Sequence, residues 1–313
     1  MRIWFIHLLL FTLVQSLHGN TINTEELFEK TSPSIFRIQV RDNDNSESFG
    51  TGFVINGGFI VTNHHVIENA KCCIAWNKGS NTFPIMKVVA DDKYRDIAIL
   101  ETISNDNKSL ALGNSDDAHI GMRIAVIGNP EGFENTISEG MISGIRNLDT
   151  YNNVFQISAP ISKGSSGSPM FNSNNEVVGM VSSFYKDGQL INFAIPSNQI
   201  NDLLLRYKTL KPPSKKLSLP DEYLTEIQGK AKSGDTKSQY MLGLIYSRTK
   251  NYSAAIQWFE LAAKKNYYPA EEMLGYFYCY GTGVPKDKGK ADYWFNQSIG
   301  HGNIEFKNRN QSP

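Results

Sequence analysis

The feature that most limits the fold of this chain is a succession of short apolar segments between Pro33 and Pro196, with no helical pattern among them. Phe36, Ile38 and Val40 alternate with polar residues, which is the two-residue period of a half-buried β-strand. Further segments of this kind are Gly52–Ile55, Phe59–Thr62, Ile97–Glu101, Arg123–Ile127, Phe155–Ser158, Val177–Ser182 and Ile191–Ile195. Many short strands without long helices between them predict an all-β barrel or sandwich.

After Pro196 the hydrophobic period changes to that of a helix. The apolar residues recur at i, i+3, i+4 and i+7, as Ile200, Leu203, Leu204 and Tyr207. Residues 208–220 are rich in lysine, proline and serine and show little periodicity, so they are predicted to be a linker.

An internal repeat follows this linker. Met241-Leu242-Gly243 recurs 32 residues later as Met273-Leu274-Gly275, and the segment 255–259 recurs as 291–295. A period of this length, with helical spacing on both sides of a turn, predicts stacked helical hairpins. The small residues Gly243 and Gly275 would let paired helices approach closely. We expect a second, all-α domain that contains an aromatic cluster. Most of the cluster should be core, and a minority of it should line a groove for a protein partner: Tyr276, Phe277, Tyr278, Tyr280, Tyr293, Trp294 and Phe295.

The net charge of the chain and its N-terminal sequence indicate which partners the protein has and where it is located. The chain has 31 basic and 31 acidic residues, so no net charge favours nucleic acid as the main partner. Met1-Arg2 followed by the apolar run Ile3–Val14 predicts a signal peptide over residues 1–19, cut after Ser16 or Gly19. The alternative is an uncleaved anchor, but the run is shorter than the roughly 20 apolar residues that a membrane span needs. We expect an exported protein, periplasmic or secreted, with no stable membrane span after cleavage.

Three short segments carry the residue types of a nucleophilic catalytic site. In chain order they are Thr62–Val66, Asp96–Leu100 and Gly164–Pro169. A serine hydroxyl is a weak nucleophile at neutral pH, so it needs an imidazole to take its proton. The imidazole needs a carboxylate that fixes its tautomer and stabilises the imidazolium. Together the segments predict a Ser-His-Asp triad and a serine endopeptidase.

Two of the three triad positions have rivals in the sequence. His64 and His65 both follow an apolar strand, and side chains alternate there, so only one of them can face a cleft. Asp96 starts a buried apolar run, where a carboxylate paired with an imidazole belongs, whereas Asp91 and Asp92 lie in a charged stretch. An aspartate at a strand start can also simply cap local amides.

Ser166 is the predicted nucleophile. Gly164 and Gly167 leave the backbone on either side of it free to adopt unusual dihedral angles. The amides of Gly164, Ser165 and Ser166 could then point at one place and form an oxyanion hole. The alternative is a flexible loop, against which the apolar strands on both sides argue.

These segments resemble those of trypsin-like serine proteases of the HtrA/DegP type, over about residues 49–201. In that family's histidine motif the last histidine before valine is the base, which favours His65. Asp96-Ile97-Ala98 resembles the aspartate motif. Gly164-Ser165-Ser166-Gly167-Ser168 resembles the nucleophile motif, which is usually Gly-Asn-Ser-Gly-Gly. Three further segments agree with the resemblance: Leu112–Ser115, Ile127–Pro130 and Phe193–Asn198.

The resemblance implies two packed six-stranded β-barrels, with His65 and Asp96 on the first barrel and Ser166 on the second. It implies hydrolysis of protein or peptide substrates through an acyl-enzyme, with no metal or organic cofactor. The specificity pocket would involve Pro160, Val181, Ser182, Ser183 and Phe193. No acidic residue lies among these positions. We therefore expect a small or medium apolar residue before the cleaved bond, rather than lysine or arginine.

The C-terminal part departs from that family. We find no PDZ domain, and the repeats resemble Sel1-like repeats, in which a Gly-x-Gly-Val turn and a Lys-Ala-x-x-Trp helix are typical. Gly281–Trp294 has both features, whereas the first copy lacks the turn. Two hairpins are fewer than the roughly three that a solenoid needs. We therefore expect the repeats to pack on the protease domain or on another subunit, and to contact a protein partner.

The predicted order is a signal peptide (1–19), a protease domain (20–207), a linker (208–220) and helical repeats (221–304). The resemblance also makes a homo-oligomer an expectation, since such proteases are often trimers. Two other functions fit the same sequence. One is a catalytically silent adaptor with a protease fold, and the other is a chaperone-like protein in which proteolysis is secondary.

Overall fold

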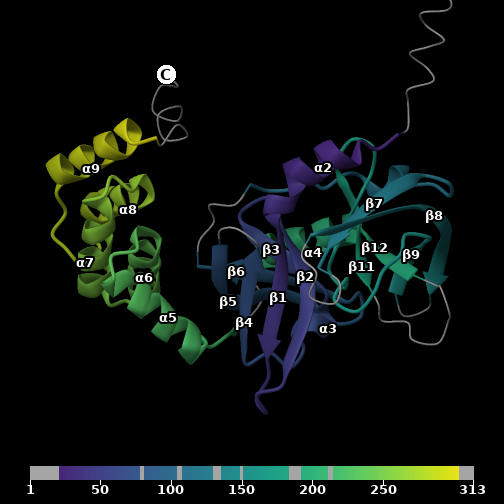
Figure 1. Cartoon of the computed structure of the whole chain (residues 1–313), viewed down its shortest axis with the longest axis horizontal. Coiled ribbons are helices and arrows are strands. Elements are labelled where there is room, and N and C mark those ends of the chain that lie inside the picture. The colour runs from purple at the N-terminus through teal and green to yellow at the C-terminus, as the bar shows by residue number, and fades with distance from the viewer. Residues whose placement is uncertain are drawn as a thin grey trace, which may run out of the picture. The chain divides into compact units, whose positions relative to one another are not determined.

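A computed structural model describes residues 21–77, 81–103, 108–129, 135–148, 151–182, 192–210 and 214–302 (Figure 1). The chain divides into two compact units, Met1–Ser218 and Leu219–Pro313. The first unit is mainly β and the second is all α, as the change of period predicts. The predicted signal peptide lies outside the described residues.

The first β-barrel is built from six strands in the order β5-β4-β1-β2-β3-β6, closed by pairing of β5 with β6. Their bounds are β1 (Ile35–Arg41), β2 (Glu47–Ile55), β3 (Phe59–Thr62), β4 (Cys72–Asn77), β5 (Asn81–Asp92) and β6 (Ile97–Thr102). A short strand, β13 (Lys215–Lys216), pairs with β5 from later in the chain. A short helix, α2 (Thr24–Thr31), precedes this barrel in sequence, and another, α3 (His64–Ile67), lies between β3 and β4.

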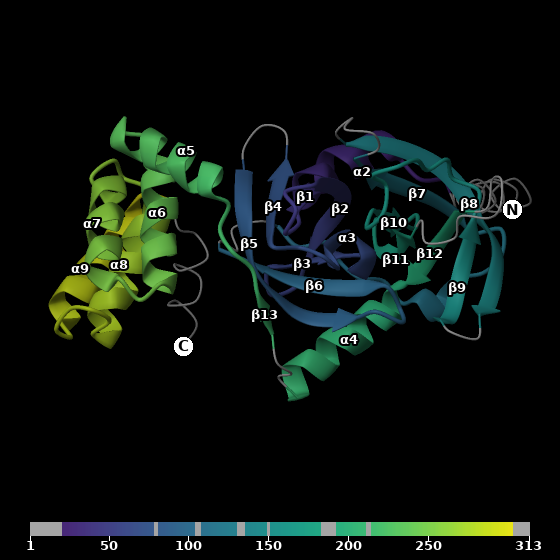
Figure 2. The ribbon, with the colours of Figure 1, turned by 90° about the horizontal axis from the view of Figure 1, so that it is seen from below.

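The second β-barrel closes in the order β10-β11-β12-β9-β8-β7 (Figure 2). Its strands are β7 (Arg123–Gly128), β8 (Thr136–Leu148), β9 (Tyr151–Ile157), β10 (Pro169–Phe171), β11 (Val177–Ser182) and β12 (Asn192–Pro196). The prediction of two six-stranded barrels is confirmed.

Four of these strands, β4, β5, β8 and β10, are absent from the segments predicted from the sequence. Among the described residues of β8 only Ile142 and Gly144 are buried, and both lie on the same face of the strand. The apolar pattern of β8 in the sequence is therefore weak. β5 contains Pro84 and changes partner along its length, from β4 to β6. β10 has three residues. These three strands are specified by their neighbours more than by their own patterns.

One apolar core joins the two barrels. It contains Phe53 and Ile97 from the first barrel and Phe171 and Met180 from the second. Helix α4 (Ser197–Leu210) adds the predicted apolar face, with Ile200, Leu203 and Leu204 buried. α4 packs against β5 and β11 (Figure 2), so it contacts both barrels.

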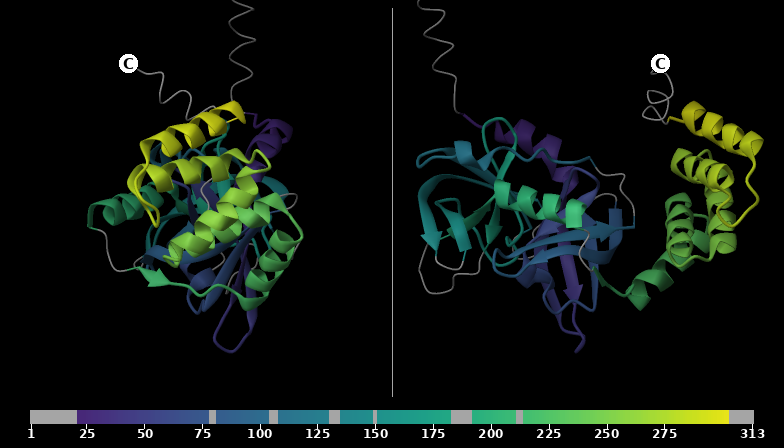
Figure 3. Two further views of the ribbon diagram at one scale, coloured as in Figure 1. Left: turned by 90° about the vertical axis from the view of Figure 1, so that its left-hand side faces the viewer. Right: turned by 180° about the vertical axis from the view of Figure 1, so that it is seen from behind.

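As far as residue 302, the second unit consists of a single helix followed by two helical hairpins (Figure 3). The helices are α5 (Asp221–Lys232), α6 (Thr236–Arg248), α7 (Tyr252–Ala263), α8 (Tyr268–Tyr280) and α9 (Lys288–Gly300). A Cβ atom on Gly243 would lie 2.4 Å from the Phe259 ring, and one on Gly275 would lie 2.5 Å from the Phe295 ring. The glycines therefore permit the close helix approach that the sequence predicts.

Two expectations about this region need correction. Of the aromatic cluster, only Phe277 is fully buried, and Tyr280 and Tyr293 are 73% and 55% exposed. These two rings lie on outward faces of α8 and α9, where the helical pattern alone does not separate core from surface. The stretch 208–220 is also not wholly a linker, because α4 extends to Leu210 and Lys215–Lys216 pair with β5.

Candidate active site

His65 lies in the first turn of α3, directly after β3, rather than at the end of the strand itself. Its backbone amide donates to Asp96 Oδ1 at 2.9 Å. Its ring nitrogen Nδ1 lies 2.9 Å from Asp96 Oδ2 and 3.0 Å from Asp96 Oδ1. The Asp96 carboxylate therefore contacts both the backbone amide and the ring of His65. This fixes the position of the ring and places the Nδ1 proton toward Asp96.

Asp96 is held by more than its histidine. It adopts a left-handed backbone conformation, with φ of 57°, and is 3% exposed. Ser182 Oγ donates to its Oδ2 at 2.7 Å, and Asn63 Nδ2 donates to its backbone carbonyl at 3.0 Å. A non-glycine residue in this conformation costs about 1–2 kcal/mol, so it persists only where the surroundings enforce it.

The rival pair, His64 and Asp91, forms a separate contact. His64 Nδ1 lies 2.6 Å from Asp91 Oδ1, and His64 Nε2 lies 3.6 Å from Glu68 Oε1. The side chain of His64 is 11% exposed, against 29% for His65. Each histidine therefore has its own aspartate. Ser182 of the second barrel bridges to the His65–Asp96 pair.

The segment around Ser166 is a sharp loop between the strands of the second barrel. Gly164 and Gly167 have φ of 95° and 88°, the region that glycine enters without steric cost. The loop is tied to β11, because Gly167 N donates to the Val181 carbonyl. The Ser165 amide donates to the Ser162 carbonyl at 3.0 Å, so it is not available to a ligand. The expected oxyanion hole is thereby reduced to the amides of Gly164 and Ser166.

Thr51, on β2, connects this loop to the first barrel and was missed in the sequence. Its amide donates to the Ser166 carbonyl at 2.7 Å, and its hydroxyl donates to the Gly164 carbonyl at 2.9 Å. The same hydroxyl accepts from the Asn129 amide at 3.1 Å. A Cβ atom on Gly167 would lie 1.9 Å from the Thr51 carbonyl oxygen, so only glycine fits there. In the sequence, the two glycines that flank Thr51, Gly50 and Gly52, are the feature that could have pointed to a close contact at this position.

The three predicted segments converge on a few positions. A Cβ atom on Gly50 would meet Val66, next to His65, at 2.7 Å and the Ser166 carbonyl at 3.2 Å. Ser182 of the second barrel reaches Asp96 of the first. The fold thus brings the loop of Ser166 close to the helix of His65, whose Nδ1 is held by a carboxylate. This set of groups is suited to acyl transfer.

The residues expected to line the specificity pocket differ from one another in burial. Pro160 is exposed and Phe193 is partly buried on β12. Val181 is fully buried in the core of the second barrel, so its side chain offers no surface to a substrate. Ser182 is 6% exposed, and its hydroxyl is engaged with Asp96. Ser183 lies outside the described residues.

Comparison with known families agrees with this geometry. Residues 50–180 match the model of the trypsin-like peptidase domain, and residues 236–267 and 269–303 match the Sel1 repeat. The chain joins a trypsin-like peptidase domain to Sel1 repeats. Within the part of the chain that the structure describes, no helix is long and apolar enough to cross a membrane.

Relatives of the peptidase domain include named proteases. A Pseudomonas fluorescens protein named "Probable periplasmic serine endoprotease DegP-like" is 34% identical over 200 residues, which cover 62% of this chain and 42% of that protein. The chloroplastic Protease Do-like 5 of Arabidopsis thaliana is 31% identical over 212 residues, or 56% of this chain and 66% of the relative. The chain thus spans less than half of the DegP-like relative.

Solved structures resemble the same part of the chain. The crystal structure of Deg5 is 28% identical with a TM-score of 0.52, covering 60% of this chain and 95% of Deg5. The HtrA-type protease AlgW with tripeptide is 25% identical with a TM-score of 0.54, covering 58% of this chain and 62% of AlgW. The peptidase domain therefore has the HtrA-type double-barrel fold.

Proposed function

We propose that this protein is an exported serine endopeptidase that hydrolyses peptide bonds through an acyl-enzyme. The observation that carries the proposal is the pairing of His65 with Asp96 by both its ring and its backbone amide, next to a Ser166 loop bound to the same barrel through Thr51. The trypsin-like peptidase domain and the DegP-like relatives support it.

In the proposed mechanism Ser166 Oγ attacks the carbonyl carbon of the substrate, and His65 Nε2 takes the hydroxyl proton. Asp96 accepts the Nδ1–H hydrogen bond and stabilises the imidazolium. The amides of Gly164 and Ser166 donate to the developing oxyanion, where each donor typically lowers the barrier by roughly 2.7–4 kcal/mol. His65 then gives its proton to the leaving amine. Water, activated by the same histidine, hydrolyses the ester and restores Ser166.

The experiment that tests this proposal is mass spectrometry of the mature chain after treatment with a fluorophosphonate. We expect one adduct, on Ser166, and none in a Ser166→Ala variant. A Ser168→Ala variant is the matched control, because Ser168 is two residues away and fully buried and should leave the adduct unchanged. Absence of an adduct from the wild-type chain would contradict the proposed activity and favour the catalytically silent adaptor.

Two finer parts of the proposal concern the substrate and the setting. We expect cleavage after small or medium apolar residues; efficient cleavage after Arg but not after Val would contradict this. Relatives named periplasmic support export. A role in protein quality control stays a prediction. The chaperone-like alternative is tested with Ser166→Ala, because failure of that variant to suppress aggregation of a model protein would count against it.

The repeats are proposed to bind a protein partner, and the two Sel1 matches, residues 236–267 and 269–303, include nearly all of the four helices α6 to α9. The exposed rings of Tyr280 and Tyr293 support this role. A homo-oligomer stays a prediction. The molecular mass of the mature protein in solution, compared with the mass of one chain, would test it.

A further inference from the structure

Four charged side chains connect α4 to the turn that carries Asp96. Arg95 Nη1 donates to Asp202 Oδ2 at 2.6 Å, and Arg206 Nη2 donates to the same oxygen at 2.8 Å. Asp92 Oδ2 lies 3.6 Å from Arg206 Nη2 and 3.9 Å from Arg95 Nε. We call this set, Asp92, Arg95, Asp202 and Arg206, the α4 clamp. Its charges alternate, so each cation contacts two anions.

The clamp continues directly into the backbone of Asp96. Asp92 Oδ1 accepts from the Arg95 amide at 3.0 Å, which closes the turn between β5 and β6. The next residue is Asp96, in its left-handed conformation. The conformation of this turn decides where the Asp96 carboxylate meets His65. A side-chain contact that fixes Arg95 therefore acts one peptide bond away from the proposed triad.

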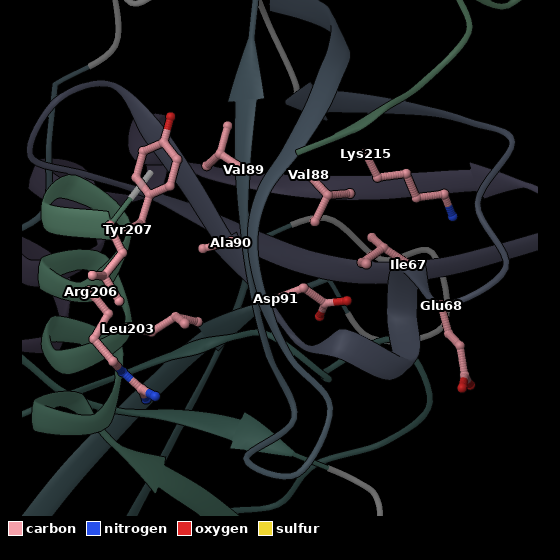
Figure 4. A pocket seen from close by; sticks show the side chains of 11 residues that line it. Ile67, Glu68, Val88, Val89, Ala90, Asp91, Leu203, Arg206, Tyr207 and Lys215 are labelled. Atoms are coloured by element: carbon pink, nitrogen blue, oxygen red, sulfur yellow. The ribbon is translucent and has the colours of Figure 1, made fainter. Parts of the chain in front are cut away.

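One member of the clamp, Arg206, also lines a pocket beside α4. This pocket of about 360 Å³ separates part of α4 from β5 and α3 (Figure 4). Arg206 lines it together with Leu203 and Tyr207 of α4, opposite Val88–Asp91 of β5. Beside this pocket, Leu203 and Leu204 of α4 still pack in one apolar core with Val89 and Ala90 of β5. The ion pairs of the clamp connect the helix to the turn there.

We propose that Arg95 and Asp202 are positioning residues of the serine protease, and that through them α4 holds the turn that presents Asp96 to His65. This inference rests on the proposed function. It predicts that loss of the clamp lowers the rate of the chemical step and leaves substrate binding intact. Neither residue touches the reacting atoms.

The effect of the clamp depends on the network and not on any single pair. An isolated exposed ion pair contributes little to stability, and Asp202 and Arg206 are 47% and 46% exposed. Arg95 and Asp92 are less exposed, at 23% and 15%, so the inner half of the clamp is better shielded. The hydrogen bond from Arg95 lowers the pKa of the Asp202 carboxyl, as expected for an anion that is paired with a cation. Removing one member would therefore disturb the turn more than the global fold.

The test is a double-mutant cycle in the full mature chain, with Arg95→Met, Asp202→Asn and the double variant. We expect each single variant to lower kcat by about 2- to 30-fold with KM unchanged. The double variant should be no worse than the poorer single variant, because both remove the same contact. Arg41→Met is the matched control, because it breaks the Arg41–Glu47 pair at 2.9 Å, which involves no residue of the triad.

A second readout does not depend on turnover. In a Ser166→Ala background, proton NMR of the His65 Nδ1–H reports its hydrogen bond to Asp96. We expect this resonance to shift or broaden in Arg95→Met and Asp202→Asn, and to stay in place in Arg41→Met. Unchanged resonance and unchanged kcat in both clamp variants would overturn the proposal. Additive effects in the double variant would also overturn it.

The two proposals can fail separately. If the wild-type chain shows no fluorophosphonate adduct, the proposed function fails, and the NMR readout still decides whether the clamp positions Asp96. If the adduct forms and the clamp variants match Arg41→Met, only the clamp proposal fails.

Discussion

At the residue scale, the candidate site depends on short polar side chains that lie between the barrels. Thr51 holds the loop of Ser166 and Ser182 holds Asp96, and each is buried. Neither bears the proposed chemistry. Both satisfy polar groups that would otherwise be left without partners in an apolar interior, which typically costs about 1–3 kcal/mol for each group.

A prediction follows for the Thr51 hydroxyl. Thr51→Val keeps the shape of the side chain but leaves the Gly164 carbonyl and the Asn129 amide without this partner. We expect a loss of about 1–3 kcal/mol in the free energy of unfolding, with a slower fluorophosphonate reaction at Ser166. Thr51→Ser retains the hydroxyl and is the control. Equal labelling rates in the two variants would show that the hydroxyl does not support the loop.

At the element scale, close packing within each helical hairpin depends on one glycine. Gly243 of α6 faces the Phe259 ring of α7, and Gly275 of α8 faces the Phe295 ring of α9. The two contacts occupy equivalent positions of the repeat. The sequence repeat thus encodes the same helix crossing twice.

Gly243→Ala and Gly275→Ala are expected to destabilise the second unit. The added methyl groups would overlap the facing rings, and overpacking of this kind costs about 1–3 kcal/mol. Gly229→Ala in α5 is the matched control, because a Cβ atom there would meet no other element of the described chain within 4 Å. Alanine there should stabilise the helix by about 0.5–1 kcal/mol. Urea unfolding followed by circular dichroism measures all three, and destabilisation by Gly229→Ala would refute the packing argument.

At the scale of the whole molecule, each unit has its own apolar interior and buries a carboxyl group, Asp96 in the first unit and Glu271 in the second. In the repeats, Glu271 is 1% exposed, and its Oε1 lies 2.8 Å from His301 Nδ1. Burial raises the pKa of Glu271, while the contact with His301 opposes the rise. Because the folded pKa lies above the unfolded value, the stability contribution is complete below the ordinary glutamate pKa and is lost as pH rises through the raised value.

We therefore expect a pH effect confined to the second unit. After correction for intrinsic exchange, hydrogen–deuterium exchange of peptides from α8 and α9 should lose protection as pH rises from about 4 toward neutrality. Glu271→Gln should remove this loss, and Asp292→Asn, at an exposed position of α9, should not. Peptides from the β-barrels should respond equally in all three proteins. The same pH dependence in Glu271→Gln would contradict the assignment.

The repeats were expected to need another surface to be stable, because two hairpins are few for a solenoid. The structure adds α5 as a fifth helix to the two hairpins, with Tyr223, Ile227 and Ala231 buried. Whether residues 221–304 need a further surface stays a prediction. Cooperative unfolding of that segment alone, with the stability of an ordinary domain, would show that they do not.

Features that depend on neighbours along the chain could be predicted from the amino-acid sequence alone. The change from a two-residue period to a helical one separates the barrels from the repeats. The glycines mark the sharp loop at Ser166 and the helix crossings. The strands missed were those with weak patterns of their own, such as β8 and β10. Local propensity determines these features, so local patterns are enough to find them.

The assembly of the site, by contrast, is a property of the tertiary structure. The fold pairs His65 with Asp96 and His64 with Asp91, and it engages the Ser165 amide elsewhere. It also brings Ser182 to Asp96 across 86 residues, and Thr51 to Gly164 across 113. Such contacts join elements that are far apart in the sequence. The residue pattern of either element alone does not predict them. The physical reason is that hydrogen bonds depend on position in space, whereas sequence patterns report only which residues are neighbours along one element.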